Sequence, residues 1–531
     1  MEKIWHRRSI ILIVVFLIIM LLLAVRVFYI QIISHEDLSR LAESQYEILV
    51  EGLDARGGIL DRNNMPLTGI SYKYYYFIEK EKWNSNLELL IDKIDGKQVA
   101  SNQSSYYVYK TDHYDEKITE KLKSNYKAYL FKSTDRYCDE QMACHLIGYL
   151  NRDELKGVSG LELLCEEQLK AENTSLCLWA DAAGTIILGD NPHKNEVKNK
   201  AEEGVAFREK TVVTTIDRRL QYVSEMALKE QKQSGAVVIM DGDTGEILSW
   251  ASGPSFNPNE IESYLKNDDT CLINKVCQAS YPPGSVFKIV TAIAGLENGF
   301  NPKTEFDCTG SAMIEGVEIN CLAGPEGGHG VLDLEKAMAV SCNCYFSRIG
   351  EVIGYEKILE TARKMGLGEN VLKDFPEEIK GNIPVNEECG PWDTVNISIG
   401  QGALLVTPIQ ICQMTALVSN GGYLVSPKIL LEEKVSKVAV VDKKSVDLIQ
   451  EGLKSVMTHG TAKADWDIDI YGKTGTAETG SGESNSNVCW FTGYCRMDKN
   501  YVITIMLEDG TYGAPETMPI LKKITDLLEK L

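Results

Sequence analysis

The pattern of apolar and polar positions begins with a long apolar segment near the N-terminus. Residues 10–25 carry no charge, and residues 27–30 extend this apolar run past Arg26. A run of this length can cross a bilayer as a tilted helix. Basic residues at positions 3, 7 and 8 precede it, which by the positive-inside rule places the N-terminus in the cytoplasm. A cleaved signal peptide is the alternative, but residues 26–29 offer no small-residue cleavage site, so we expect an uncleaved anchor over residues 9–30.

The remaining pattern predicts a small mixed module and a larger α+β domain. Residues 71–130 are polar, rich in Tyr and Lys and mixed in period, which predicts a small α/β module. The segments expected after residue 210 are a strand over 211–217, a helix over 218–231, strands over 235–240 and 246–252 with a hairpin turn over 241–245, helices from 285 to about 414, strands over 468–473, 488–494 and 501–508, and a helix over 518–531. Strands at both ends with helices between them predict a single antiparallel sheet built from N- and C-terminal pieces.

Composition narrows the function classes without selecting one. The 531 residues are 44% hydrophobic and 25% charged, which is typical of globular proteins. The formal net charge of −21 argues against a nucleic-acid partner. The 14 cysteines show no repeated C-x-x-C pattern, so they do not form a disulfide scaffold.

Two cysteines are a partial exception. Cys308 and Cys321 flank a hairpin-like segment over residues 309–320, and His329 follows shortly after. The two thiols could form a disulfide, contribute with His329 to a metal site, or have no function. Because thiols without a function are the more common case, we assign no metal ligand and expect no cofactor.

The first candidate catalytic residues lie at the start of an apolar helix. This helix is expected from Val286 to Leu296 and follows a turn over residues 281–284. Ser285 and Lys288 lie three residues apart, so they share one helical face about one turn apart. A buried lysine is costly unless it is paired or deprotonated, and a deprotonated lysine can take the proton of a serine and activate it as a nucleophile. The alternative is an N-capping serine beside a lysine that extends to the surface.

A second stretch could serve this pair. Ser341 and Asn343 follow a helical pattern over residues 332–340. The hydroxyl could move a proton between Lys288 and a leaving amine, and the amide could hold the lysine and a substrate carbonyl.

A third stretch, Lys473-Thr474-Gly475-Thr476, lies at the end of an expected edge strand. Such a strand could pair with an extended peptide, and its ammonium and hydroxyl groups could bind a terminal carboxylate. Gly475 would let another backbone approach closely. The N–H groups of residue 476 and Ser285 could form an oxyanion hole.

The order S-x-x-K, S-x-N and K-T-G in one domain resembles the motif set of penicillin-binding proteins and serine β-lactamases. Nearly the whole chain is similar to a class B penicillin-binding protein. The segments that carry this wider resemblance are Arg56 to Arg62 (R-G-x-I-x-D-R), Gly160-Leu161-Glu162, Gly328-His329-Gly330, Gly400-Gln401-Gly402, Thr407-Pro408-Ile409-Gln410 and Trp490 to Tyr494. Asn63-Asn64 replaces the Asn-Gly turn that is usual in the family.

The resemblance implies an α+β fold, with a penicillin-binding/serine β-lactamase-like transpeptidase domain on an elongated N-terminal pedestal. In that domain, helices flank an antiparallel sheet. The implied organisation is a cytoplasmic tail over 1–8, a transmembrane signal anchor over 9–30, a pedestal or dimerisation-like domain over 31–205, and a transpeptidase domain over 206–531.

The resemblance also implies a reaction, peptidoglycan D,D-transpeptidation. A D-Ala-D-Ala stem peptide would acylate the serine, lose its last D-Ala, and pass to the amine of a neighbouring strand. The implied roles are nucleophile for Ser285, base for Lys288, proton relay for Ser341, substrate contact for Asn343, and binding of the substrate or β-lactam carboxylate by Lys473, Thr474, Gly475 and Thr476.

The implied partners are peptidoglycan stem peptides, β-lactam antibiotics, the plasma membrane and a membrane glycosyltransferase of the shape, elongation, division and sporulation group. A separate glycosyltransferase is expected because the region before the transpeptidase domain shows no signature of its own for that activity. The implied location is the bacterial cell membrane, with a single span, a cytoplasmic N-terminus and an extracytoplasmic catalytic domain.

Three other functions stay open. A serine β-lactamase on this fold would need a base that activates water, and no E-x-x-x-N-like element is apparent. A β-lactam receptor would carry a cytoplasmic signalling domain, and only about eight residues precede the expected anchor. An inactive cell-wall scaffold is the third possibility, against which the three intact motifs argue.

Overall fold

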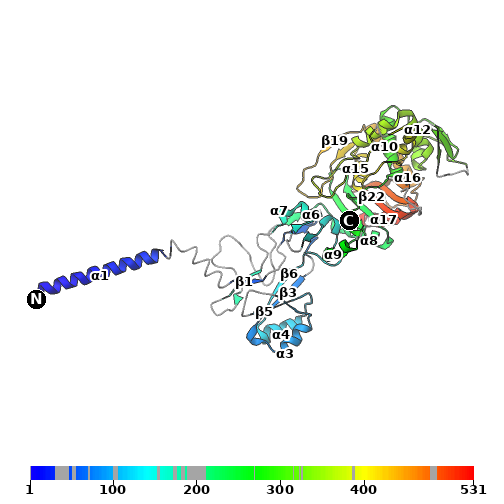
Figure 1. Ribbon diagram of the computed structural model, residues 1–531. Coiled ribbons are helices and arrows are strands. Elements are labelled where there is room, and N and C mark those ends of the chain that lie inside the picture. Colours follow the sequence, from blue (N-terminus) through cyan, green and yellow to red (C-terminus); the bar gives the residue numbers. More distant parts are fainter. Residues whose placement is uncertain are drawn as a thin grey trace. The chain divides into compact units, whose positions relative to one another are not determined.

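The structure is a computed structural model that forms two compact units, neither of them continuous in sequence (Figure 1). The first unit comprises Met1–Ala55, Ser71–Asp135 and Ala171–Arg208, and the second comprises Arg56–Ile70, Arg136–Lys170 and Glu209–Leu531. The residues described are 2–29, 31, 47–50, 56–69, 72–99, 106–151, 156–170, 176–180, 186–187, 211–267, 270–314, 316–321, 323, 327–385, 389–478 and 487–531. The second unit thus takes two segments from the stretch over 31–205 that the sequence assigns to one N-terminal domain.

Helix α1 (Glu2–Phe28) coincides with the apolar N-terminal segment of the sequence. Within the part of the chain that the structure describes, no helix meets the length and hydropathy that a membrane span requires. The anchor over residues 9–30 therefore stays a prediction.

The first unit contains the small α/β module that the sequence predicts over residues 71–130. Its antiparallel sheet has the order β4-β5-β3-β6, from strands β3 (Tyr72–Glu79), β4 (Lys97–Val99), β5 (Tyr106–Thr111) and β6 (Tyr129–Thr134). Helices α3 (Ser85–Asp92) and α4 (Glu116–Tyr126) follow the caps Asn84 and Asp115 and bury Leu87 and Leu122 in the core of the module. Besides α1, the described part of this unit contains η2 (Lys80–Lys82), β1 (Glu47–Val50), β9 (Leu176–Ala180) and β10 (Ile186–Ile187).

The second unit is organised around a five-stranded antiparallel sheet of order β13-β12-β22-β21-β20. Its strands are β12 (Gly235–Asp241), β13 (Ile247–Gly253), β20 (Ile470–Glu478), β21 (Asn487–Arg496) and β22 (Asn500–Gly510). β12 pairs with β22, where Gly235 lies opposite Leu507. This pairing confirms the prediction that N- and C-terminal pieces share one sheet.

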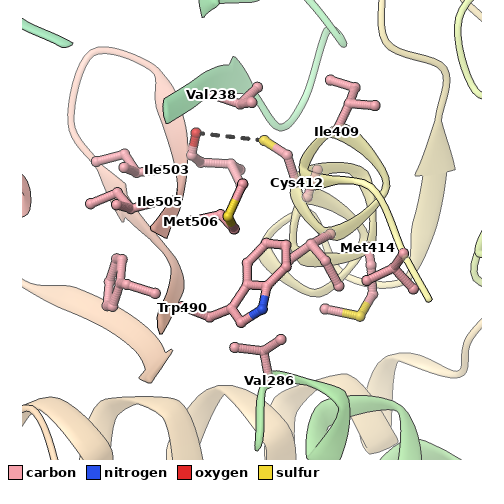
Figure 2. Packing of buried hydrophobic residues seen from close by; sticks show 14 of the residues in the cluster. Val238, Val286, Ile409, Cys412, Met414, Trp490, Ile503, Ile505 and Met506 are labelled. Atoms are coloured by element: carbon pink, nitrogen blue, oxygen red, sulfur yellow. Dashed lines mark hydrogen bonds between the residues drawn. The ribbon is translucent and has the colours of Figure 1, made fainter. Parts of the chain in front are cut away.

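Helices cover both faces of this sheet. Helix α15 (Pro408–Ser419) packs on β12, β21 and β22, and all of its residues are buried. Helices α8 (Arg218–Gln231) and α17 (Gly513–Leu528) pack on the opposite face (Figure 1). Figure 2 shows Trp490 of β21 in the core, where it lies between Val286 and Met414. Met414 belongs to α15. The helix expected over residues 218–231 is confirmed at both ends by α8, and Asp217 caps its first turn.

A largely helical region lies between β13 and β20 in the sequence and packs on β20. Its helices are α9 (Ile261–Lys266), η3 (Thr270–Leu272), η4 (Gly284–Phe287), α10 (Lys288–Glu297), α11 (Leu334–Ala339), α12 (Asn343–Ile353), α13 (Tyr355–Lys364), α14 (Pro391–Ser398) and α16 (Lys443–Thr458). Short strand pairs accompany them, namely β14 (Phe306–Cys308) with β17 (Gly330–Leu332), β15 (Ser311–Ile314) with β16 (Val317–Asn320), and β18 (Tyr423–Val425) with β19 (Lys437–Ala439).

The segments Arg56–Ile70 and Arg136–Lys170 belong to the second unit and contain short elements and buried charged side chains. The elements are the parallel pair β2 (Gly58–Leu60) with β11 (Thr211–Val213), the pair β7 (Leu150–Asn151) with β8 (Lys156–Gly157), and helices α5 (Cys144–Ile147), α6 (Gly160–Leu164) and α7 (Glu166–Leu169). Arg56 Nε donates to Glu162 Oε2 at 2.6 Å, and Arg136 Nε donates to Glu162 Oε1 at 2.5 Å. The Tyr137 hydroxyl donates to the same carboxylate at 2.8 Å. The R-G-x-I-x-D-R and G-L-E segments of the sequence therefore contact each other.

Replacing Glu162 tests this buried contact. Glu162→Gln leaves the buried Arg136 guanidinium without the carboxylate that pairs with it and removes one of the two carboxylates at Arg56, which keeps Glu166. We therefore expect it to lower the free energy of unfolding by about 3–5 kcal/mol, measured by urea denaturation of the full chain. Lys443 and Asp447 form an exposed ion pair that serves as the control. Asp447→Asn should change the same quantity by less than about 0.5 kcal/mol. A loss below about 1 kcal/mol for Glu162→Gln would contradict the stabilising role of the contact.

Candidate active site

Ser285 lies where a tight turn leads into a buried helix. The 3-10 turn η4 continues directly into α10, so the helix expected from Val286 is confirmed with a tighter first turn. Ser285 is partly exposed, whereas Lys288 is fully buried. The Lys288 amine donates to Ser285 Oγ at 3.1 Å. The three-residue spacing therefore places the two groups in contact, as the sequence predicts.

The second motif holds Lys288 in place. The amine donates to the Ser341 carbonyl oxygen at 2.8 Å, to Ser341 Oγ at 3.2 Å and to Asn343 Oδ1 at 2.7 Å. Ser341 follows α11 and has a φ of +55°, which is costly for a residue with a side chain. That conformation lets both oxygens of Ser341 contact one amine. Ser341 and Asn343 are thus brought to Lys288, as the sequence predicts.

The Lys473 amine, which lies on strand β20, also contacts the Ser341 hydroxyl. This amine is fully buried and donates to Ser341 Oγ at 2.9 Å and to the Thr474 carbonyl oxygen at 2.9 Å. The prediction that K-T-G ends its strand is wrong. β20 continues to Glu478 because its pairing with β21 extends as far as Asn487. β20 is also the outermost strand, and its other edge pairs with no strand among the described residues.

Burial lowers the pKa of both lysines. Desolvation lowers the pKa of the Lys288 amine to about 8. It also lowers the pKa of the Lys473 amine well below the usual lysine value, and the neighbouring charge of Lys288 lowers it further. Two ammonium groups at one serine hydroxyl are mutually unfavourable. The two shifts therefore make loss of one proton from this pair of amines easier than from exposed lysines.

Two glycines allow the serine turn to approach its neighbours closely. Gly284 has a φ of +53°, and a Cβ there would lie 2.7 Å from the Thr476 carbonyl oxygen. Gly400 has a φ of +78°, and a Cβ there would lie 2.1 Å from the Gly284 carbonyl oxygen. The Trp490 indole N–H donates to the Pro282 carbonyl oxygen at 3.0 Å. The G-Q-G and W-F-T-G-Y segments therefore support the turn that carries Ser285.

The two threonines of the third motif already have partners. Thr474 Oγ1 lies 2.8 Å from Thr461 Oγ1, and the Gly513 N–H donates to Thr476 Oγ1 at 3.0 Å. Sequence reasoning missed Thr461 and Gly513, and no local pattern marks either residue. Binding of a substrate carboxylate by this motif stays a prediction.

A thiol cluster lies beside the second motif. Cys308, Cys321, His329 and Cys342 each offer one donor atom, and these atoms all lie within 4.8 Å of one another. These four residues could hold a metal ion. The sequence placed Cys308 and Cys321 together with His329 but missed Cys342, although this thiol occupies the middle position of the S-x-N motif.

Comparisons with known proteins agree with the geometry. The family model for the penicillin binding protein transpeptidase domain matches residues 235–526, more than half of the chain. Stage V sporulation protein D of Bacillus subtilis is 27% identical over 545 residues, which cover 93% of this chain and 80% of that relative. The peptidoglycan D,D-transpeptidase MrdA of Acinetobacter baumannii is 26% identical over 568 residues, which cover 94% of this chain and 84% of that relative.

The likeness also extends to solved structures. A structure described as "Structural coordination of polymerization and crosslinking by a peptidoglycan synthase complex" matches with a TM-score of 0.72 and 25% identity, covering 97% of this chain and 97% of that chain. The sheet, the helices on both faces and the three motifs fit this family throughout. The chain therefore belongs to the penicillin-binding proteins with a transpeptidase domain, in their class B.

Proposed function

We propose that this chain is a peptidoglycan D,D-transpeptidase that cross-links stem peptides through an acyl group on Ser285. The observation that carries the proposal is a continuous path of hydrogen bonds from the nucleophile to the sheet. It runs from Ser285 Oγ to the Lys288 amine at 3.1 Å, on to Ser341 Oγ at 3.2 Å, and on to the Lys473 amine at 2.9 Å. The reaction class agrees with the name of the relative MrdA.

The first half-reaction forms the acyl-enzyme. The neutral Lys288 amine takes the Ser285 proton while Oγ attacks the carbonyl carbon that joins the last two D-Ala residues. The backbone N–H groups of Ser285 and Thr476 hold the oxyanion. The C–N bond then breaks, and the departing D-Ala amine takes a proton from the Ser341 hydroxyl. Lys288 returns its proton to Ser341 through their 3.2 Å contact.

The second half-reaction transfers the acyl group. The amine of a neighbouring strand attacks the Ser285 ester, its proton passes to Lys288, and Ser285 leaves as the hydroxyl. A β-lactam follows only the first half-reaction, because its leaving amine stays attached to the acyl group. The resulting acyl-enzyme therefore persists.

The outer edge of β20 is the proposed binding site for the stem peptide. An extended peptide can add to a free strand edge through main-chain hydrogen bonds. A substrate carboxylate near Lys473 would raise the pKa of that lysine and favour its charged form. The charge on Lys473 would in turn favour the neutral form of Lys288. Substrate binding would thus activate the base, with Asn343, Thr474 and Thr476 as further contacts.

The proposed setting is the outer side of the bacterial cell membrane, with a single span over residues 9–30 and a cytoplasmic N-terminus. The proposed partner is a membrane glycosyltransferase of the shape, elongation, division and sporulation group. The similar structure described as a peptidoglycan synthase complex that coordinates polymerization and crosslinking supports such a partner.

Replacement of Ser285 tests the nucleophile. We expect Ser285→Ala to form no covalent adduct with a fluorescent penicillin, measured on gels and by intact-protein mass, because no oxygen remains to form the ester. Ser263 is an exposed serine on α9, and Ser263→Ala is the control that should label at the normal rate. An adduct on the Ser285→Ala protein would rule out Ser285 as the acylated residue.

The pH dependence tests the base. Because the pKa of Lys288 is lowered to about 8, the neutral fraction rises with pH and reaches its plateau above that value. The second-order rate constant of acylation by penicillin should therefore rise about tenfold per pH unit between pH 6 and 7.5 and level off above about pH 8.5. Stopped-flow tryptophan fluorescence measures this constant.

Lys288→Arg is the matched variant for that experiment, since arginine keeps its proton throughout the range. It should acylate about 10²- to 10⁴-fold more slowly. A flat pH profile, or normal acylation of Lys288→Arg, would remove Lys288 from the role of base.

The reaction with a chromogenic cephalosporin distinguishes a transpeptidase from a β-lactamase and from an inactive scaffold. We expect one equivalent of colour per active site in a rapid burst, followed by very slow release, because the acyl-enzyme persists. Many turnovers per second would identify a β-lactamase. Absence of a burst would identify an inactive scaffold.

A further inference from the structure

One buried lysine lies outside the path of proton transfer. Among the described residues, three lysine side chains are buried, and two of them, Lys288 and Lys473, belong to the candidate active site. The third, Lys275, lies between η3 and η4, and its side chain is only 3% exposed. Its amine lies 4.0 Å from Glu508 Oε2, near the end of β22. Because a buried ammonium group is costly without a counter-charge, the Glu508 carboxylate compensates the charge of Lys275.

The Glu508 carboxylate also accepts hydrogen bonds from two hydroxyl groups. The Tyr281 hydroxyl donates to Oε1 at 2.6 Å, and the Ser234 hydroxyl donates to Oε2. Burial raises the pKa of the Tyr281 phenol, and the adjacent carboxylate raises it further, so the phenol keeps its proton and acts as the donor. One carboxylate on the late strand β22 thus contacts three residues that precede Ser285 in the sequence.

Tyr281 is the first residue of the turn that leads to Ser285. Its main chain pairs with Val406 through two hydrogen bonds, each of 2.9 Å. Its ring packs edge-on against Trp490 of β21, with the ring centroids 6.4 Å apart, and the Trp490 indole holds the carbonyl of the next residue, Pro282. The contact of the Tyr281 hydroxyl with Glu508 adds a link from the same residue to β22. The start of the turn is therefore held by two adjacent strands of the sheet.

We propose that Glu508, paired with Lys275, is a positioning residue for Ser285 and acts through the Tyr281 hydroxyl. A charged carboxylate binds a hydroxyl donor more strongly than a neutral acceptor does, so it fixes where the turn begins relative to β22. Ser285 follows this turn directly, and a shift of the turn would displace both its Oγ and its N–H, which is one donor of the proposed oxyanion hole. Glu508 takes no part in proton transfer. The inference rests on the proposed function, because it takes Ser285 as the nucleophile.

Acylation of the full chain by penicillin tests this contact, because rapid-quench intact-protein mass spectrometry separates binding from reaction. Tyr281→Phe keeps the ring and removes the hydroxyl, and Glu508→Gln keeps the shape and removes the charge. Each variant should lower the acylation rate constant at saturating penicillin about tenfold and change the dissociation constant less than about twofold, since a displaced nucleophile reacts slowly with a ligand that still binds. The double variant should be within about twofold of the slower single variant, because both changes remove the same contact.

Three further variants complete the comparison. Lys275→Met removes the counter-charge of Glu508 and should also lower the saturating rate constant about tenfold. The matched controls are Tyr222→Phe and Glu529→Gln, which make the same two chemical changes at exposed positions on α8 and directly after α17. Both controls should react at the normal rate. A normal rate for Lys275→Met would overturn the part of the proposal that assigns Lys275.

The labelled fraction distinguishes positioning from a structural role alone. A structural role would lower the fraction of protein that labels and leave the rate constant of the labelled fraction unchanged, and that result would overturn the proposal. A normal saturating rate constant for Tyr281→Phe would overturn it as well, as would effects of the Tyr281 and Glu508 changes that multiply in the double variant. An adduct on the Ser285→Ala protein would instead overturn the nucleophile itself, whatever rates the other variants show.

Discussion

Two lysine amines are buried against one serine hydroxyl, and the construction of the site follows from this constraint. Lys288 begins a helix, Lys473 lies within the outermost strand, and neither side chain has exposed surface. A carboxylate beside Lys288 would hold its proton in place. The acceptors that the structure places there are neutral instead: the Ser341 carbonyl, two serine hydroxyls and the Asn343 amide. The amine is thus positioned by hydrogen bonds that do not fix its charge, which agrees with the proposed role of Lys288 as a base.

Much of the fold could be predicted because its signals are local. The hairpin of β12 and β13 and the amphipathic helix α8 appear in the sequence as alternation, turn residues and a helical period. The full extent of β20 did not appear, because Lys473 and Thr474 interrupt the apolar pattern and are buried only by tertiary contacts. The division into two discontinuous units was equally invisible. The second unit includes the contact of Arg56 with Glu162, and no periodic pattern links residues so far apart.

The difference between local signals and tertiary contacts also decides which parts of the candidate site could be predicted. The contact between Ser285 and Lys288 follows from a spacing of three residues, and the role of Ser341 and Asn343 followed from the motif set. The hydrogen bond between Thr461 and Thr474, and the approach of Cys342 to Cys321, arise only when separate elements fold back on one another. The sequence also assigned Lys473 to the substrate carboxylate alone, whereas its amine contacts the Ser341 hydroxyl. Motif spacing identified the participants, and tertiary structure assigned their contacts.

The joining of early and late strands in one sheet has a consequence for the biosynthesis of the protein. Ser285 and Ser341 are synthesised well before Lys473, and β21 is the one strand that pairs with β20 in the described part of the chain. The central strand β12 must also wait for β22, which lies near the C-terminus. Contacts of such large sequence separation form late, after the loop between them has closed. The contacts of the candidate site are therefore incomplete during translation, and they can form only when the chain is nearly complete.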